Sequence, residues 1–181
     1  MAAPPRKYAR IERERRFLLA ALPPEAERAA RWEQLEDLYF TGTTLRLRLV
    51  RAPDGSVRER KLSQKLPGPD GAAHARIITS VYLDAAEHAL LSRLPGARLA
   101  KRRHRLAWDG HELGIDVFLG VLDGLVLMEV EAESEPALRA FAPPPFARRE
   151  VTDDALFRGG SLATADPAAA LSRARELLEG A

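Results

Sequence analysis

The sequence contains no cysteine, which excludes disulfide bonds, zinc sites built on thiolates and a cysteine nucleophile. It also lacks an apolar run of the roughly 20 residues that a membrane-spanning helix needs. Aromatic residues make up only 6% of the chain, so surfaces for stacking nucleic-acid bases are scarce. Net charge is also small, because 28 basic and 26 acidic side chains leave a formal charge of +2. Bulk charge therefore does not indicate nucleic-acid binding.

The composition that remains is typical of a soluble globular protein. The chain has 181 residues, of which 46% are hydrophobic and 30% charged, enough for one domain with a sizeable core. The N-terminus is polar and basic and has no apolar signal core, so we expect a cytoplasmic protein. We predict a single domain over residues 1–181, with a loose leader at 1–9, the main body at 10–163 and a C-terminal helix at 167–179.

A hydrophobic period of two predicts strands over much of the chain. Between residues 39 and 51, leucines alternate with arginines. The dipeptide Asp109-Gly110 separates two further runs, at 99–108 and 113–118, and is the strongest hairpin signal in the sequence. Other strands are predicted at 57–66, 76–83 and 125–133.

Helices are fewer. We predict them at 25–38, at 85–94 behind an N-capping Asp84, at 136–141 and at 167–179. Residues 11–19 are compatible with either a strand or a helix. Seven or eight strands joined by hairpins predict an α+β fold in which an antiparallel barrel is closed or nearly closed.

Charged residues recur at a spacing of two, so within each strand they share one face. Their signs are segregated by strand. The acids are Glu12, Glu14, Asp116, Glu129 and Glu131, and the bases are Arg16, Arg46, Arg48, Lys61, Lys65, Lys101, Arg103 and Arg105. Such faces are commonly solvated outer surfaces, but surfaces that favour solubility intersperse the two signs. The segregation favours an inward-facing arrangement.

An inward charged face predicts a tunnel that binds a metal and a polyphosphate. Clustered carboxylates need a counter-charge to stay ionised, and a divalent cation such as Mg²⁺ prefers oxygen ligands. Arginines on the opposite wall would pair with phosphate oxygens.

Several motifs, in order along the chain, resemble those of the CYTH family, the triphosphate tunnel metalloenzymes. The segment IERERRFLL at 11–19 is similar to the opening E-x-E-x-K signature, with Arg16 in place of lysine. Further similar segments are TLRLR at 44–48, LSQK at 62–65, LAKRR at 99–103, IDVF at 115–118, MEVE at 128–131, FAPPPF at 141–146 and EVTD at 150–153. The resemblance spans residues 10–163.

The resemblance implies an eight-stranded antiparallel tunnel with helices outside, and metal-dependent hydrolysis of inorganic triphosphate or a related triphosphate. The implied metal ligands for Mg²⁺ or Mn²⁺ are Glu12, Glu14, Asp116, Glu129 and Glu131. The implied phosphate ligands are Arg16, Arg46, Arg48, Lys61, Lys65, Arg76, Lys101 and Arg103. Catalytic roles fall on Arg16, Lys65 and Glu129. We expect a small-molecule substrate, no nucleic-acid or membrane partner, and a monomer or homodimer.

The chain also departs from the family pattern. Ile78 and Ser80 stand where an acidic pair is usual, and Gly114 replaces a further acid. Gly160 takes the place of a lysine, for which Arg158 is a substitute. The sequence therefore leaves open whether the chain has one metal site or two. Three alternatives also remain: an adenylate cyclase of class IV type on the same fold, a non-catalytic polyphosphate or nucleotide binder, and RNA binding by the basic strands.

Overall fold

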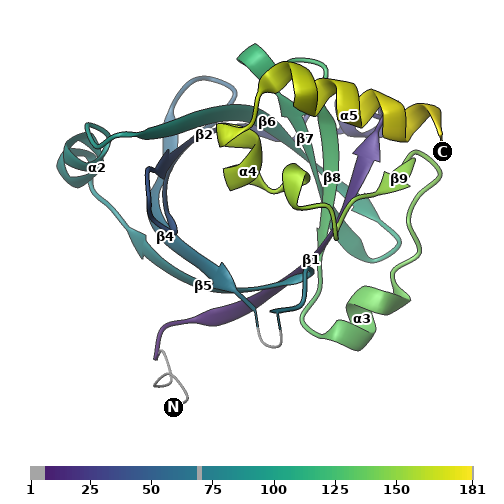
Figure 1. The fold of residues 1–181 in the computed structure, drawn as a ribbon, viewed down its shortest axis with the longest axis horizontal. Helices are drawn as coiled ribbons and strands as arrows, with labels where there is room; N and C mark the ends of the chain where they lie inside the picture. Colours follow the sequence, from purple (N-terminus) through teal and green to yellow (C-terminus); the bar gives the residue numbers. More distant parts are fainter. Residues whose placement is uncertain (1–6, 69–70, 181) are drawn as a thin grey trace.

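The computed structural model describes residues 7–68 and 71–180, so most of the predicted leader, residues 1–6, lies outside the described residues. Eight antiparallel strands form a closed barrel, seen end-on in Figure 1. They are β1 (Arg10–Leu19), β2 (Trp32–Phe40), β3 (Leu45–Arg51), β4 (Val57–Pro67), β5 (Ala75–Tyr82), β6 (Gly96–Trp108), β7 (His111–Phe118) and β8 (Val126–Glu131). Their order is β5-β4-β3-β2-β6-β7-β8-β1, and pairing of β1 with β5 closes the ring. The predicted eight-stranded antiparallel barrel is confirmed.

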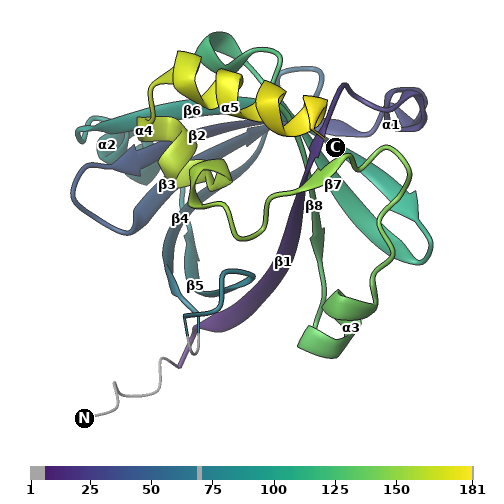
Figure 2. The same cartoon turned by 45° about the vertical axis from the view of Figure 1, so that its right-hand side comes forward.

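Short helices lie outside the ring or over its opening (Figures 1 and 2). They are α1 (Pro24–Ala29), α2 (Ala85–Leu91), α3 (Glu135–Ala140), α4 (Gly159–Thr164) and α5 (Pro167–Glu179), and the two-residue strand β9 (Arg149–Glu150) extends the sheet beside β1. Figure 1 shows α4 over part of the opening and α5 across the strands beside it. None of the helices in the described part of the chain is long and apolar enough to cross a membrane.

Strand alternation separates an apolar outer layer from a charged lumen. On β1, Phe17 and Leu19 pack in a cluster with Met128 and Leu138, outside the ring. On the other face, Glu12, Glu14 and Arg16 are followed by the buried Leu18, which packs with Phe157 and Leu162 under α4 and α5. The lumen face of β1 therefore changes from charged to apolar where the C-terminal helices cover it.

Strand pairing decides the outcome of the following sequence expectations. The predicted helix at 25–38 is wrong, because the helix ends at Ala29 and Ala30 has left-handed backbone angles (φ 50°). Residues 32–40 instead form β2 between β3 and β6, and this tertiary pairing overrides the helix propensity of glutamate and leucine. The ambiguous segment 11–19 is a strand. The Asp109-Gly110 hairpin is confirmed, with positive φ at both residues (45° and 76°), as a type I′ turn requires.

Candidate functional site

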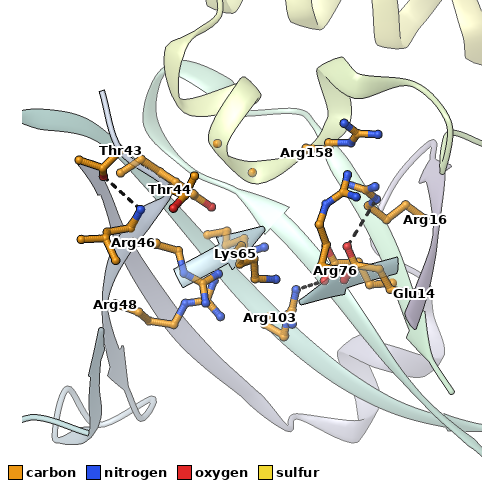
Figure 3. A pocket seen from close by; sticks show the side chains of 16 residues that line it. Glu14, Arg16, Thr43, Thr44, Arg46, Arg48, Lys65, Arg76, Arg103 and Arg158 are labelled. Atoms are coloured by element: carbon orange, nitrogen blue, oxygen red, sulfur yellow. Dashed lines mark hydrogen bonds and ion pairs between the residues drawn. The ribbon is translucent and has the colours of Figure 1, made fainter. Parts of the chain in front are cut away.

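A cavity of about 240 Å³ lies in the barrel lumen (Figure 3). Figure 3 shows Arg46 and Arg48 on one side, Glu14 and Arg16 on the other, and Lys65 between them. Among the described residues, two acids, Glu14 and Glu129, line the cavity together with eight bases, namely Arg16, Arg46, Arg48, Lys65, Arg76, Lys101, Arg103 and Arg158. This surplus of positive charge along the lining of a partly enclosed space favours binding of an anion.

Three arginines of the cavity carry buried nitrogens with nothing to bind. The Nε atoms of Arg16, Arg46 and Arg158 are shielded from solvent and have no hydrogen-bond partner among the described residues. Arg16 is nevertheless held in place, since its two Nη atoms donate to the carbonyls of Phe157 and Thr152 at 3.2 and 3.3 Å. Buried donors without acceptors are costly, so the protein leaves the hydrogen bonding of these three cavity arginines incomplete.

Positive charges lie close together where Arg16, Arg76 and Arg158 line the cavity. The pKa of Arg76 is lowered from its ordinary value by burial first, and then by the positive charges of Arg158 and Arg16. The Arg76 Nη1 atom donates to the Ala75 carbonyl at 2.8 Å, so the side chain is fixed beside the other two. Three neighbouring guanidinium groups, two of them held by hydrogen bonds, are suited to the several negative oxygens of a polyphosphate.

Beside the cavity lies a cluster of three carboxylates. One oxygen each from Glu12, Glu14 and Glu131 lies within 4.8 Å of the other two. Burial raises the pKa of Glu14, and the charge of Glu129 raises it further. Burial also raises the pKa of Glu131, as does the charge of Glu12. Because a cation would relieve this repulsion and all donors are oxygens, the cluster fits a hard divalent metal.

The other two acids expected to bind metal are paired with bases instead. Asp116 has a fully buried side chain and accepts from Arg103 Nε and Nη2 at 2.7 and 2.6 Å. Lys101 also donates to Asp116, and Arg103 donates to Glu129. Burial raises the pKa of Glu129, but Arg103 and Lys101 outweigh it and hold this pKa well below its usual range. The five predicted metal ligands thus divide into an acidic cluster and a base-paired couple.

Gly114 makes room for this arrangement. A Cβ atom at this position would lie 3.4 Å from the Nε atom of Arg103. The missing side chain therefore leaves space for the guanidinium between Asp116 and Glu129. At the other departures from the family pattern, Ile78 is buried and the hydroxyl of Ser80 lies 2.9 Å from that of Ser63.

Most of the predicted phosphate ligands line the cavity, and Lys61 does not. Its Nζ atom pairs with Glu59 at 2.7 Å, and it lines a second cavity of about 240 Å³ with Arg48, Arg103 and Arg105. Since Arg48 and Arg103 border both cavities, they separate two chambers of the lumen.

Sequence reasoning missed Asp37, because it placed residue 37 in a helix, and it gave no role to Tyr39 at the start of the predicted strand run 39–51. The carboxylate of Asp37 is fully buried and accepts from Arg48 Nε and Nη2, both at 2.7 Å. Tyr39 lines the cavity, and burial raises its pKa to about 12, so the phenol stays protonated. The sequence signal was the spacing of two between Asp37 and Tyr39, together with the adjacent aromatic Phe40, which is typical of a strand.

Comparison with known proteins places the fold and the site in a family. No protein-family model matches the chain. The inorganic triphosphatase of Nitrosomonas europaea is 33% identical over 159 residues, which cover 86% of this chain and 99% of that protein. A crystal structure of the inorganic triphosphatase NE1496 is 29% identical, with a TM-score of 0.59 over 86% of this chain and 96% of its own. The PH1819 protein of Pyrococcus horikoshii shares the fold at 21% identity, with a TM-score of 0.51 over 71% of this chain and 82% of its own.

The relative at 33% identity covers nearly the whole of both chains, and the barrel carries its charged residues on the inside. The chain therefore belongs to the CYTH family of triphosphate tunnel metalloenzymes.

Proposed function

We propose that the protein hydrolyses inorganic triphosphate or a related triphosphate, with a divalent metal, in the lumen cavity. One observation carries this proposal: eight bases against two acids line the cavity in the described chain, and three of the bases have buried, unpartnered nitrogens. The similarity to an inorganic triphosphatase over almost all of both chains supports it.

The basic side chains bind and orient the substrate. Arg16, Arg46, Arg48, Lys65, Arg76, Lys101 and Arg103 surround the space where the phosphates would lie, and Arg158 joins them. Preorganised positive charge stabilises the charge that develops on transferred phosphoryl oxygens. A guanidinium at position 16 is suited to bind substrate oxygens and not to carry protons. Lys61 would contact only a substrate that reaches the second chamber.

We assign the metal to Glu12, Glu14 and Glu131, whose oxygens already converge. The ion is Mg²⁺ or Mn²⁺, and when bound it would spread the negative charge of the phosphate oxygens. Glu129 borders both the cluster and the cavity, and its low pKa keeps it ionised. It is therefore suited to accept a hydrogen bond from the attacking water and orient it. Asp116 is fixed between Lys101 and Arg103, and we assign it to holding these two bases.

The small number of unpaired acids in the lumen favours a second candidate function, binding without catalysis. Asp116 and Glu129 are paired with bases, and Ile78 and Ser80 add no acid to the lumen. A tunnel short of free carboxylates is suited to hold a polyphosphate without cleaving it. A non-catalytic polyphosphate binder is therefore the alternative.

Phosphate release from tripolyphosphate, ATP and thiamine triphosphate, measured with Mg²⁺, with Mn²⁺ and with a chelator, tests the proposal. We expect metal-dependent release of orthophosphate from at least one of them. Calorimetric binding of tripolyphosphate without release would identify a binder, and cyclic AMP from ATP would identify a cyclase. If the protein neither binds nor hydrolyses any of these compounds, the assignment of the cavity is overturned.

A further inference from the structure

A buried carboxylate stands behind the basic wall of the cavity. Asp37 of β2 lies directly opposite Arg48 of β3 in the antiparallel register. Both of its oxygens accept from the Arg48 guanidinium at 2.7 Å, in the parallel two-bond geometry that fixes an arginine most firmly. The Asp37 side chain has no exposed area and does not line the cavity. It therefore contacts substrate only through its partners.

Asp37 also acts on the neighbouring base of β3. Arg46 Nε lies 3.8 Å from Asp37 Oδ1, close enough for attraction but too far for a hydrogen bond. That nitrogen is buried and unpartnered in the described chain. Arg46 is thus attracted by the carboxylate without a hydrogen bond to it, and the residue still lines the cavity. Arg46 and Arg48 share a strand face and would otherwise repel each other.

The charges in this group are fixed. Burial raises the pKa of Asp37, but Arg48 and Arg46 outweigh it and hold that pKa well below its usual range. Burial lowers the pKa of Arg48, but Asp37 outweighs it and raises that pKa far above its usual range. The pair stays ionised at any pH at which the enzyme works, so the geometry does not depend on a proton.

We propose that Asp37 is a positioning residue that holds Arg48 and Arg46 in the arrangement that grips the triphosphate. This inference rests on the proposed function, because it assigns those two arginines to the substrate. It gives β2 a role in binding although its carboxylate never meets a phosphate.

Two explanations of Asp37 predict opposite outcomes. If Asp37 only neutralises charge, Asp37→Asn makes the cavity more positive and tightens binding of an anion. If Asp37 positions the arginines, the same change frees them, and binding weakens despite the added positive charge. Asp37→Glu separates the explanations again, because it keeps the charge and displaces the carboxylate by one methylene group. Positioning predicts a defect there, and neutralisation predicts none.

Calorimetric titration with tripolyphosphate in the presence of a chelator measures binding without catalysis, and kcat and KM with Mn²⁺ measure turnover. For both Asp37→Asn and Asp37→Glu we expect weaker metal-free binding and a rise in KM, each about tenfold or more. The matched control is Glu36→Gln, which removes an ion pair of 3.1 Å with Arg51 from the neighbouring position of the same strand. It should bind and turn over like the parent.

A double variant separates positioning from damage to the fold. With Arg48→Met already present, adding Asp37→Asn should cost much less affinity than it costs alone, because the held group is gone. Arg48→Met also removes the buried arginine charge that Asp37→Asn leaves uncompensated and that destabilises the single variant. Equal or tighter tripolyphosphate binding by Asp37→Asn would overturn the inference. Absence of both binding and phosphate release in the parent, with and without metal, would instead overturn the proposed function.

Discussion

The ammonium group of Lys65 donates to Glu12 Oε2 at 2.7 Å, and this contact joins the basic wall of the lumen to the acidic cluster. Lys65 lies on β4 and Glu12 on β1, with β5 between them in the ring. Glu12 is also one of the three carboxylates that converge. A lysine and a metal ion would therefore compete for the same oxygen.

This competition predicts opposite effects of Lys65→Met on metal and on substrate. Without substrate, the variant should bind Mn²⁺ about two- to thirteenfold more tightly, because Glu12 loses a hydrogen bond with a net value of about 0.5–1.5 kcal/mol. The KM for tripolyphosphate should rise, because the cavity loses a base. Mn²⁺ titration followed by electron paramagnetic resonance measures the first effect, and Lys61→Met, whose lysine pairs with Glu59, is the control. Weaker Mn²⁺ binding by Lys65→Met would refute the competition.

Glu14→Gln tests the assignment of the metal. The change keeps the size of the side chain and removes the charge, so Mn²⁺ affinity should fall at least about tenfold and phosphate release about a hundredfold. The metal-free protein should lose little thermal stability, because burial and Glu129 already oppose ionisation of this carboxyl. Glu112→Gln, which removes an exposed pair with Arg105, is the matched control. Hydrolysis as fast as that of the parent would show that Glu14 is not a ligand.

The sequence was sufficient to place side chains on a face, because strand alternation is a local property. Arg46 and Arg48 are brought to one cavity by their spacing of two. It was not sufficient to say which lumen residues meet. The two-residue Asp109-Gly110 turn already sets Arg103 opposite Asp116, but only closure of the ring sets Glu14 opposite Glu131. The acidic cluster therefore follows from pairing between strands that lie far apart in the sequence.

The sequence analysis missed most of β2, because pairing with distant strands overrides its local helix propensity. Its segment, WEQLEDLYF, follows an Ala- and Glu-rich helix and has the propensity to continue it. It is a strand because β3 and β6 supply hydrogen-bonding partners on both sides. Asp37 was missed with it, and so was the counter-charge of the basic wall.

Gly159 allows α4 to sit on the mouth of the cavity. A Cβ atom at this position would lie 2.3 Å from the hydroxyl of Tyr39, so Gly159→Ala should destabilise the protein by about 1–3 kcal/mol. Adding Tyr39→Phe removes the clashing oxygen and should restore part of the loss. Gly160→Ala, whose Cβ would lie 3.4 Å from the same ring, is the milder control. Urea denaturation of the parent and the three variants measures these differences. The expectation fails if Gly159→Ala is as stable as the parent.

The buried Asp37–Arg48 pair predicts how stability depends on acid. The pKa of Asp37 is depressed by folding, so its contribution is fully present above its ordinary value of 3.8 and is lost as pH falls through the folded value. At pH 7, Asp37→Asn should therefore lower the free energy of unfolding by about 3–5 kcal/mol, because it leaves a buried arginine unpaired.

The difference in free energy of unfolding between parent and Asp37→Asn should narrow as pH falls below 3.8. The unfolded parent then binds a proton at Asp37, which the folded parent does not yet bind. Urea denaturation of both proteins at pH 7, 5 and 3 measures the gap. Glu36→Gln should stay close to the parent throughout, because its partially exposed pair with Arg51 contributes little. A gap that stays constant down to the lowest pH at which both proteins fold would show that folding does not lower the pKa of Asp37. A gap that widens on acidification would contradict the ion pair itself.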